Sequence, residues 1–212
     1  MLPQDCPLPI GRREANRATR REAILDVAHR SFLERGYAAT TMSAIAASLG
    51  GSKGTLWSYF ASKELLFAAV LDRATTLFQA QIAQALNPRD GVADSLHAFA
   101  RQFLDRITAA DAVALYRLVI GEARRFPETG RIFHERAPGR TRALLAAYLE
   151  AAMARGQLRA ADPMAASRQL MSLCMGGCHQ QLLLGLIDKA PRKAIVEEAE
   201  LAVDSFLRAY AA

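Results

Sequence analysis

The sequence has little of the chemistry on which most catalytic and metal sites depend. Its 212 residues include only three cysteines and four histidines. The cysteines, Cys6, Cys174 and Cys178, are too few and too unevenly spaced for a disulfide framework. No two histidines have metal-ligand spacing on one helix, and no Ser/His/Asp arrangement is apparent. We therefore expect no catalytic site, no metal site and no cofactor.

Long apolar runs and strand-like alternation are also missing. The N-terminus has no hydrophobic signal core, and no apolar stretch approaches the ~20 residues of a membrane-spanning helix. The most apolar helix, around residues 144–154, is interrupted by Glu150. Alanine and leucine, which favour helices, are abundant. We expect an all-α, soluble and cytoplasmic protein with no membrane partner.

Positive charge is concentrated near the N-terminus. The formal net charge is +6, and nine basic against five acidic residues lie within the first 63 positions. Residues 1–11 contain three prolines and a glycine, and Arg12, Arg13 and Arg17 follow. This pattern predicts a flexible basic arm over residues 1–17. It suits a polyanionic partner, to which it would add affinity rather than specificity.

The most informative stretch is 40–63, which predicts two short helices around a glycine corner. In the first helix the apolar residues recur at i, i+3, i+4 and i+7 from Met42, and Thr41 is placed to cap its start. Gly50 and Gly51 end this helix, because glycine reaches left-handed backbone angles without steric cost. Ser52 is placed to cap the second helix.

The second short helix has an apolar side and a polar, aromatic side. Leu56 and Phe60 face inward at i, i+4, and the outward residues are Lys53, Gly54, Thr55, Trp57, Ser58 and Tyr59. Two helices of this size joined by a short turn containing glycine predict a helix-turn-helix. The second helix of that motif fits the major groove of DNA.

Helical periodicity continues along the rest of the chain. Ser62 and the pair Asp162-Pro163 are start signals, the second because proline suits the first helical position. The helices predicted outside the motif cover residues 19–35, 62–86, 90–109, 111–126, 128–156 (one or two, broken near Pro138-Gly139), 162–186 and 191–207.

Residues 18–70 closely resemble, without a gap, the DNA-binding domain of the TetR/AcrR family. The matching residues are Thr40-Thr41, Ile45-Ala46, Leu49-Gly50, the run Ser52–Phe60 apart from Trp57, and Ser62–Leu66. Gly51 stands where the family usually has valine, and Trp57 where it usually has tyrosine. A looser similarity, to the C-terminal domain of AefR-like regulators, covers Leu118–Phe126, Glu128–Glu135 and Leu144–Gly156.

The resemblance implies an all-α, Ω-shaped homodimer. A helix-turn-helix domain at 18–63 would precede an effector-binding and dimerisation domain at 64–212, whose last two helices would form a four-helix bundle with the partner. The implied function is a transcriptional repressor, released from a palindromic double-stranded DNA operator when a small hydrophobic effector binds. The positions that match family DNA contacts are Thr41, Ser52, Lys53, Gly54, Thr55, Trp57, Ser58, Tyr59 and Lys63.

These contact positions divide into two roles. We expect Lys53 and Thr55 to reach base edges and Gly54 to permit close backbone approach. Phosphate contacts, which set register without reading sequence, fall to Thr41, Trp57, Tyr59 and Lys63.

Candidate effector-pocket residues are ring-bearing or polar residues on the middle helices: Phe99, Phe103, Tyr116, Glu122 and His179. Ordinary core packing is the commoner role for each of them taken singly. Two other interpretations stay open. Cys174 and Cys178, one helical turn apart, could sense a soft metal or an oxidant, although packing at a helix interface explains them more simply. A helical enzyme or scaffold would explain the C-terminal two-thirds but not residues 40–63.

Overall fold

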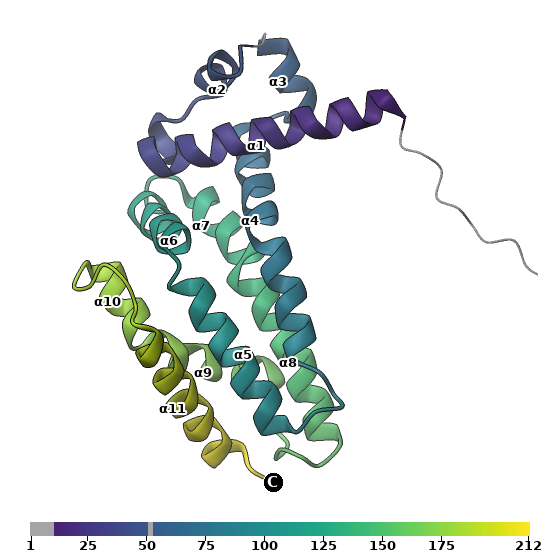
Figure 1. Cartoon of the computed structure of the whole chain (residues 1–212), viewed down its shortest axis with the longest axis vertical. Helices are drawn as coiled ribbons and strands as arrows, with labels where there is room; N and C mark the ends of the chain where they lie inside the picture. Colours follow the sequence, from purple (N-terminus) through teal and green to yellow (C-terminus); the bar gives the residue numbers. More distant parts are fainter. Residues whose placement is uncertain (1–10, 51–52) are drawn as a thin grey trace, which may run out of the picture. The chain divides into compact units, whose positions relative to one another are not determined.

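The computed structural model of the chain describes residues 11–50 and 53–212, apart from the side chains of Arg12 and Lys53. Within these ranges the chain forms eleven helices and no strand (Figure 1). The prediction of an all-α fold is therefore confirmed. Nowhere in the described ranges is a helix long and apolar enough to cross a membrane.

The chain divides into two compact units, of which the first ends at Val70 and the second begins at Leu71. This boundary lies inside the helix α4 (Lys63–Ala85) rather than at its start, where the sequence placed it. The first turns of α4 belong with the first unit because Phe67 packs in its core. The Phe67 ring lies 5.1 Å from that of Phe32 and 5.3 Å from that of Tyr37.

The first unit contains α1 (Arg12–Ala39), α2 (Met42–Ser48), α3 (Lys53–Tyr59) and the start of α4. The predicted apolar stripe of α1 is buried at Ile24, Ala28 and Phe32. Gly36 interrupts α1 with a φ of 80°, a backbone angle that favours glycine. The Thr40 hydroxyl then donates to the carbonyl of Gly36 at 2.8 Å, which fastens the chain before α2.

The predicted flexible arm over residues 1–17 is wrong for residues 12–17, which form the first turns of α1. These residues form a helix because of their composition. They are mostly arginine, glutamate and alanine, which favour helices, and they contain no glycine or proline. Residues 1–10, which carry the rest of that prediction, lie outside the described ranges.

The predicted helix starts and stops around the motif are present. The Thr41 hydroxyl accepts the Ala44 N–H at 3.1 Å, and the Ser62 hydroxyl accepts the Leu65 N–H at 3.2 Å. Gly50 has a φ of 62°, which ends α2 as expected. The cap predicted at Ser52 falls outside the described residues.

The second unit contains the rest of α4 and seven further helices. These are α5 (Val92–Ile107), α6 (Ala110–Glu122), α7 (Pro127–Arg136), α8 (Pro138–Ala154), α9 (Pro163–Met175), α10 (Cys178–Leu184) and α11 (Arg192–Tyr210). Its core forms where α11 packs on α5 and α9, and α8 packs on α9. The predicted break near Pro138 separates α7 from α8.

The single helix predicted over 162–186 is two helices, α9 and α10, divided at Gly176 and Gly177. A side-chain carbon at Gly177 would overlap the carboxylate of Glu198. That carboxylate comes from α11 and accepts the Cys178 N–H at 2.8 Å, so it satisfies a backbone donor at the start of α10. The break therefore depends on a tertiary contact that helical periodicity does not reveal.

Candidate functional site

Helix α3 turns its polar side outward. Leu56 is 2% exposed and anchors the helix, whereas Trp57 is 49% exposed although it is a large aromatic residue. Gly54, Thr55 and Ser58 are also exposed, and the Ser58 hydroxyl donates to the Thr55 carbonyl at 2.7 Å. Such a face offers hydrogen-bonding groups and a flat ring to a partner. The side chains of Ser52 and Lys53 lie outside the described part.

Arginines of α1 lie beside this face. The Arg17 guanidinium stands 5.7 Å from the centre of the Tyr59 ring, and that of Arg21 stands 5.5 Å from the Phe60 ring. Arg20 donates to the carbonyl of Leu49 at 3.3 Å. Arg17 belongs to the basic arm that was expected to add affinity for a polyanion, and none of the three was among the positions matched to family DNA contacts. Their spacing of three to four positions on one helix is the sequence signal that points to them.

Lys63 is held at the first turn of α4. Its ammonium donates to the Tyr37 carbonyl at 2.9 Å and lies 4.0 Å from the centre of the Tyr37 ring. Hydrogen bonds from the Ser62 hydroxyl and the backbone lower the pKa of the neighbouring Glu64, with smaller effects from Tyr37 and Lys63. The Lys63 cation is therefore fixed close to a helix N-terminus, an arrangement that favours a phosphate.

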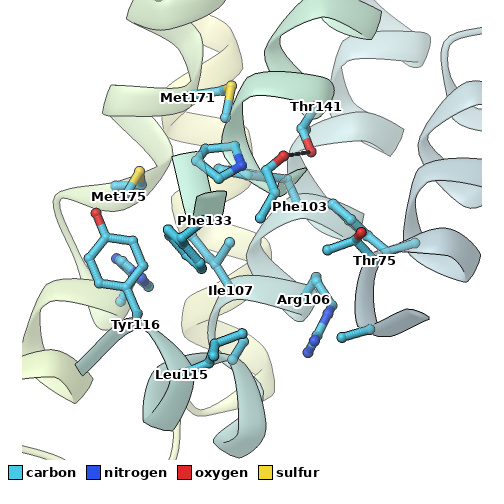
Figure 2. A pocket seen from close by; sticks show the side chains of 16 residues that line it. Thr75, Phe103, Arg106, Ile107, Leu115, Tyr116, Phe133, Thr141, Met171 and Met175 are labelled. Carbon is cyan, nitrogen blue, oxygen red and sulfur yellow. Dashed lines mark hydrogen bonds between the residues drawn. The ribbon is translucent and has the colours of Figure 1, made fainter. Parts of the chain in front are cut away.

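A cavity of about 90 Å³ lies within the second unit (Figure 2). Its wall comes from α4, α5, α6, α9, α10 and the corner between α7 and α8, and most of it is apolar. Three of the predicted pocket residues, Phe103, Tyr116 and His179, line it. The other two do not. Phe99 is fully buried and stacks on Phe103 at 5.7 Å, and Glu122 is the last residue of α6.

Among the polar side chains in the wall, Arg106, Thr75 and Thr141 have protein partners, whereas the Tyr116 hydroxyl and the His179 ring make no hydrogen bond within the described ranges. Arg106 makes two hydrogen bonds of 2.9 Å to the carboxylate of Asp111. The Thr75 hydroxyl donates to the Leu71 carbonyl at 2.9 Å, and the Thr141 hydroxyl to the Ala137 carbonyl at 3.3 Å. Arg106, Thr75, Met171 and Met175 are lining residues that the sequence did not indicate.

His179 and Tyr116 form the aromatic end of the cavity. His179 is 2% exposed, and burial lowers the pKa of its imidazole, which is therefore neutral at pH 7. Tyr116 stands edge-on to the His179 ring at 5.3 Å and to the Phe133 ring at 5.5 Å. Edge-on packing of this kind is the preferred arrangement of aromatic pairs.

The two cysteines of the C-terminal half are buried thiols. Burial, with a smaller contribution from the charge of Glu198, raises the pKa of Cys174 to about 12, and burial and Glu198 raise that of Cys178 to about 11. Thiolates, the form that binds metals and reacts with oxidants, are thus disfavoured at pH 7. Among the described residues no group of three or more potential ligands could hold a metal ion.

Comparison with known proteins agrees with the division of the chain into two units. Residues 24–70 match the DNA-binding domain of the bacterial regulatory proteins of the tetR family, and residues 94–212 match the C-terminal domain of AefR-like transcriptional repressors. The solved structure of the flavonoid-responsive regulator FrrA is 36% identical. The match covers 92% of this chain and 98% of the FrrA chain, with a TM-score of 0.81.

Two characterised regulators match over shorter regions. The repressor ComR of Escherichia coli is 34% identical over 95 residues, which are 42% of this chain and 45% of ComR. The activator FasR of Mycolicibacterium smegmatis is 36% identical over 100 residues, which are 46% of each chain. This chain thus spans about half the length of these curated relatives. Because the AefR-like match alone covers more than half of it, the chain belongs to the TetR family of transcriptional regulators, which are DNA-binding proteins and not enzymes.

Proposed function

We propose that the protein is a repressor that leaves its operator when a small, mainly apolar molecule occupies the cavity of the second unit. The observation that carries this proposal is the cavity wall itself. Ala74, Thr75 and Phe78 of α4 line it, and the same continuous helix begins at Lys63, one of the DNA-contact positions. A bound molecule therefore contacts the helix that both units share.

On the DNA side, α3 would enter the major groove. Lys53 and Thr55 are assigned to base edges, because lysine pairs with guanine acceptors and threonine reaches either base. Gly54 would let the helix backbone approach the bases closely, and Ser52 and Ser58 complete the set of contacts. Phosphate contacts fall to Thr41, Trp57, Tyr59 and Lys63, which would set the register on the duplex.

The protein would act as a homodimer on a palindromic operator. Leu184, Leu186 and Leu201 are each more than two-thirds exposed, which is unusual for large apolar residues gathered in α10, α11 and the segment between them. A second copy of the chain would bury them in a two-fold interface, and two-fold symmetry of the protein requires two-fold symmetry of the operator.

Release would follow from a difference in affinity. A ligand shifts an equilibrium only as far as it prefers one state over the other. Here the cavity contacts α4 and also Ala137 and Pro138 of the corner to which α4 is hydrogen-bonded, so occupation would favour the arrangement of α4 that does not fit the operator. FrrA is named as flavonoid-responsive, which makes flavonoids the first compounds to test as effectors.

The cavity must expand for a molecule of that size. Its volume of about 90 Å³ is below the roughly 300–1,000 Å³ of typical ligand sites. Met171 and Met175 in the wall have flexible side chains that adapt to a new neighbour.

Fluorescence anisotropy tests the DNA-binding half of this proposal. Purified protein is titrated onto duplexes tiled across the region upstream of its own gene, at two salt concentrations and with a scrambled duplex as control. We expect one tile to bind ~10³-fold or more tighter than the scrambled duplex. Uniform binding that weakens steeply with salt would mean only a basic surface, or an operator elsewhere. Absence of binding at low salt would refute DNA recognition.

A further inference from the structure

We infer that the cavity selects an uncharged aromatic molecule carrying a hydroxyl group, a phenol, and that His179 is the residue that binds this hydroxyl. This inference rests on the proposed function, because it specifies the chemical class of the effector. It follows from three features of the cavity wall: a buried polar group without a hydrogen bond, no available cation among the described lining residues, and an aromatic lining.

His179 is that buried polar group, and the half-buried Tyr116 beside it also makes no side-chain hydrogen bond within the described ranges. The His179 side chain lines the cavity and is 2% exposed, yet its ring nitrogens make no hydrogen bond in the part of the chain that the structure describes. A buried polar group without a partner costs free energy that a correctly placed ligand group recovers. A neutral imidazole has one acceptor nitrogen and one donor nitrogen. A ligand hydroxyl, which both donates and accepts, is the smallest group that satisfies either of them.

The second feature excludes an acidic ligand. Among the described lining residues, Arg106 is the only one with a permanent positive charge, and that charge is balanced by Asp111, to whose carboxylate it makes two hydrogen bonds of 2.9 Å. His179 contributes no charge at pH 7, since burial lowers the pKa of its ring. A carboxylate in this cavity would therefore lose its hydration without gaining a counter-ion.

The third feature favours a flat ring. Figure 2 shows Tyr116, Phe133, Met171 and Met175 around the same side of the cavity. Aromatic edges and polarisable sulfurs both make favourable contacts with an aromatic ligand. An apolar cavity of ~150 Å³ is known to hold benzene, so the present 90 Å³ needs only small movements of the two methionines to admit one substituted ring.

The test uses three single-ring probes that differ in one group: 4-ethylphenol, its methyl ether 4-ethylanisole, and 4-ethylbenzoate. Their dissociation constants are measured on the full chain at pH 7.5 by isothermal titration calorimetry. We expect the phenol to bind at least tenfold tighter than the ether, which has lost the donor, and the benzoate to show no binding. His179→Phe should bring phenol and ether within about twofold of each other, because it removes the polar partner and keeps a ring.

Two further variants serve as controls. His179→Gln keeps an acceptor and a donor, so it should retain part of the preference for the phenol, and it serves if the phenylalanine variant does not fold. His97→Gln changes a histidine of the same unit that does not line the cavity, and it should leave all three constants unchanged. Melting curves followed by circular dichroism establish that each variant is folded.

Several results would overturn the inference: equal binding of phenol and ether, tightest binding of the benzoate, no binding of any probe, or an undiminished phenol preference in folded His179→Phe. The operator titration described above is run on the same preparation without probes. If the phenol preference is found but no operator is bound, the repressor proposal fails and the ligand class stands. If an operator is bound and the phenol preference is absent, the ligand class alone fails.

Discussion

Asp72 of α4 binds Arg136, the last residue of α7, with an Nη1–Oδ2 distance of 3.0 Å. Arg140, in the first turn of α8, reaches the same carboxylate at 2.9 Å. Two further side chains of α4, Thr75 and Gln79, donate to the Arg136 carbonyl at 3.4 and 3.3 Å. These contacts tie α4 to the α7–α8 corner, and residues of both line the cavity. We call these contacts between α4 and the α7–α8 corner the clasp. We propose that the clasp transmits the effect of ligand binding from the cavity to α4.

The Asp72→Asn substitution tests the clasp. The three side chains are about a third exposed or more, so the loss of unfolding free energy should be no more than about 1 kcal/mol. The ratio of operator affinities without and with bound effector should fall toward one, because α4 is no longer held to the corner that the ligand contacts. Urea unfolding and operator anisotropy measure the two effects. An unchanged ratio would show that coupling does not pass through Asp72.

Lys63→Ala should weaken binding to the operator and to unrelated duplexes alike. A phosphate contact carries no sequence information, and its removal should reduce the slope of log affinity against log salt by about one. Because Lys63 also binds the Tyr37 carbonyl, the melting temperature must be compared with that of the native protein. A loss confined to the operator, with an unchanged salt slope, would contradict the phosphate assignment.

Lys53→Ala should instead relax discrimination at a single base pair by ~1–3 kcal/mol, the usual value of a base-edge contact. The measurement is the affinity for operators substituted one base pair at a time. If all affinities fall by the same factor, Lys53 is a backbone contact and the division of roles between Lys53 and Lys63 is wrong.

Gly177→Ala should destabilise the second unit, because the new methyl group overlaps the Glu198 carboxylate and displaces it from the Cys178 N–H. Leaving that donor unsatisfied should cost ~1–3 kcal/mol. Gly176→Ala is the matched control. A side-chain carbon at this position meets nothing within 4 Å, and the backbone there is helical. The unfolding free energy of the Gly176→Ala variant, measured in urea, should therefore not fall. Equal effects of the two substitutions would contradict this explanation of the helix break.

The buried His179 should make stability depend on pH. Burial lowers the pKa of its ring in the folded chain, whereas the unfolded chain has the ordinary value of about 6.5. Below that pH the unfolded state binds a proton that the folded state does not, so stability should fall as the pH drops from about 6.5 toward the folded pKa. The difference in unfolding free energy between native protein and His179→Gln, measured from pH 7.5 to 5, should show this dependence. A constant difference would contradict it.

Local patterns predicted the first unit well because its structure depends on neighbours in sequence. Thr41 and Ser62 cap the helices that follow them, and Leu56 and Phe60 are buried at the expected spacing. The cavity was less accessible to sequence reasoning, because its wall is assembled from seven separate helices. Phe99 and Phe103 lie four residues apart on α5, yet only Phe103 reaches the cavity. No periodicity distinguishes them, since both are buried apolar residues of one helix.

Linkage between the cavity and the operator tests the central claim most directly. The operator dissociation constant is measured by anisotropy with and without 4-ethylphenol, at a concentration that calorimetry shows to saturate the protein. The account predicts that the bound compound weakens operator binding by a factor of about 5–150, the usual range of coupling between two sites. In His179→Phe at the same concentration the factor should be close to one. An unchanged operator affinity in the saturated native protein would contradict the proposal that this cavity controls DNA binding.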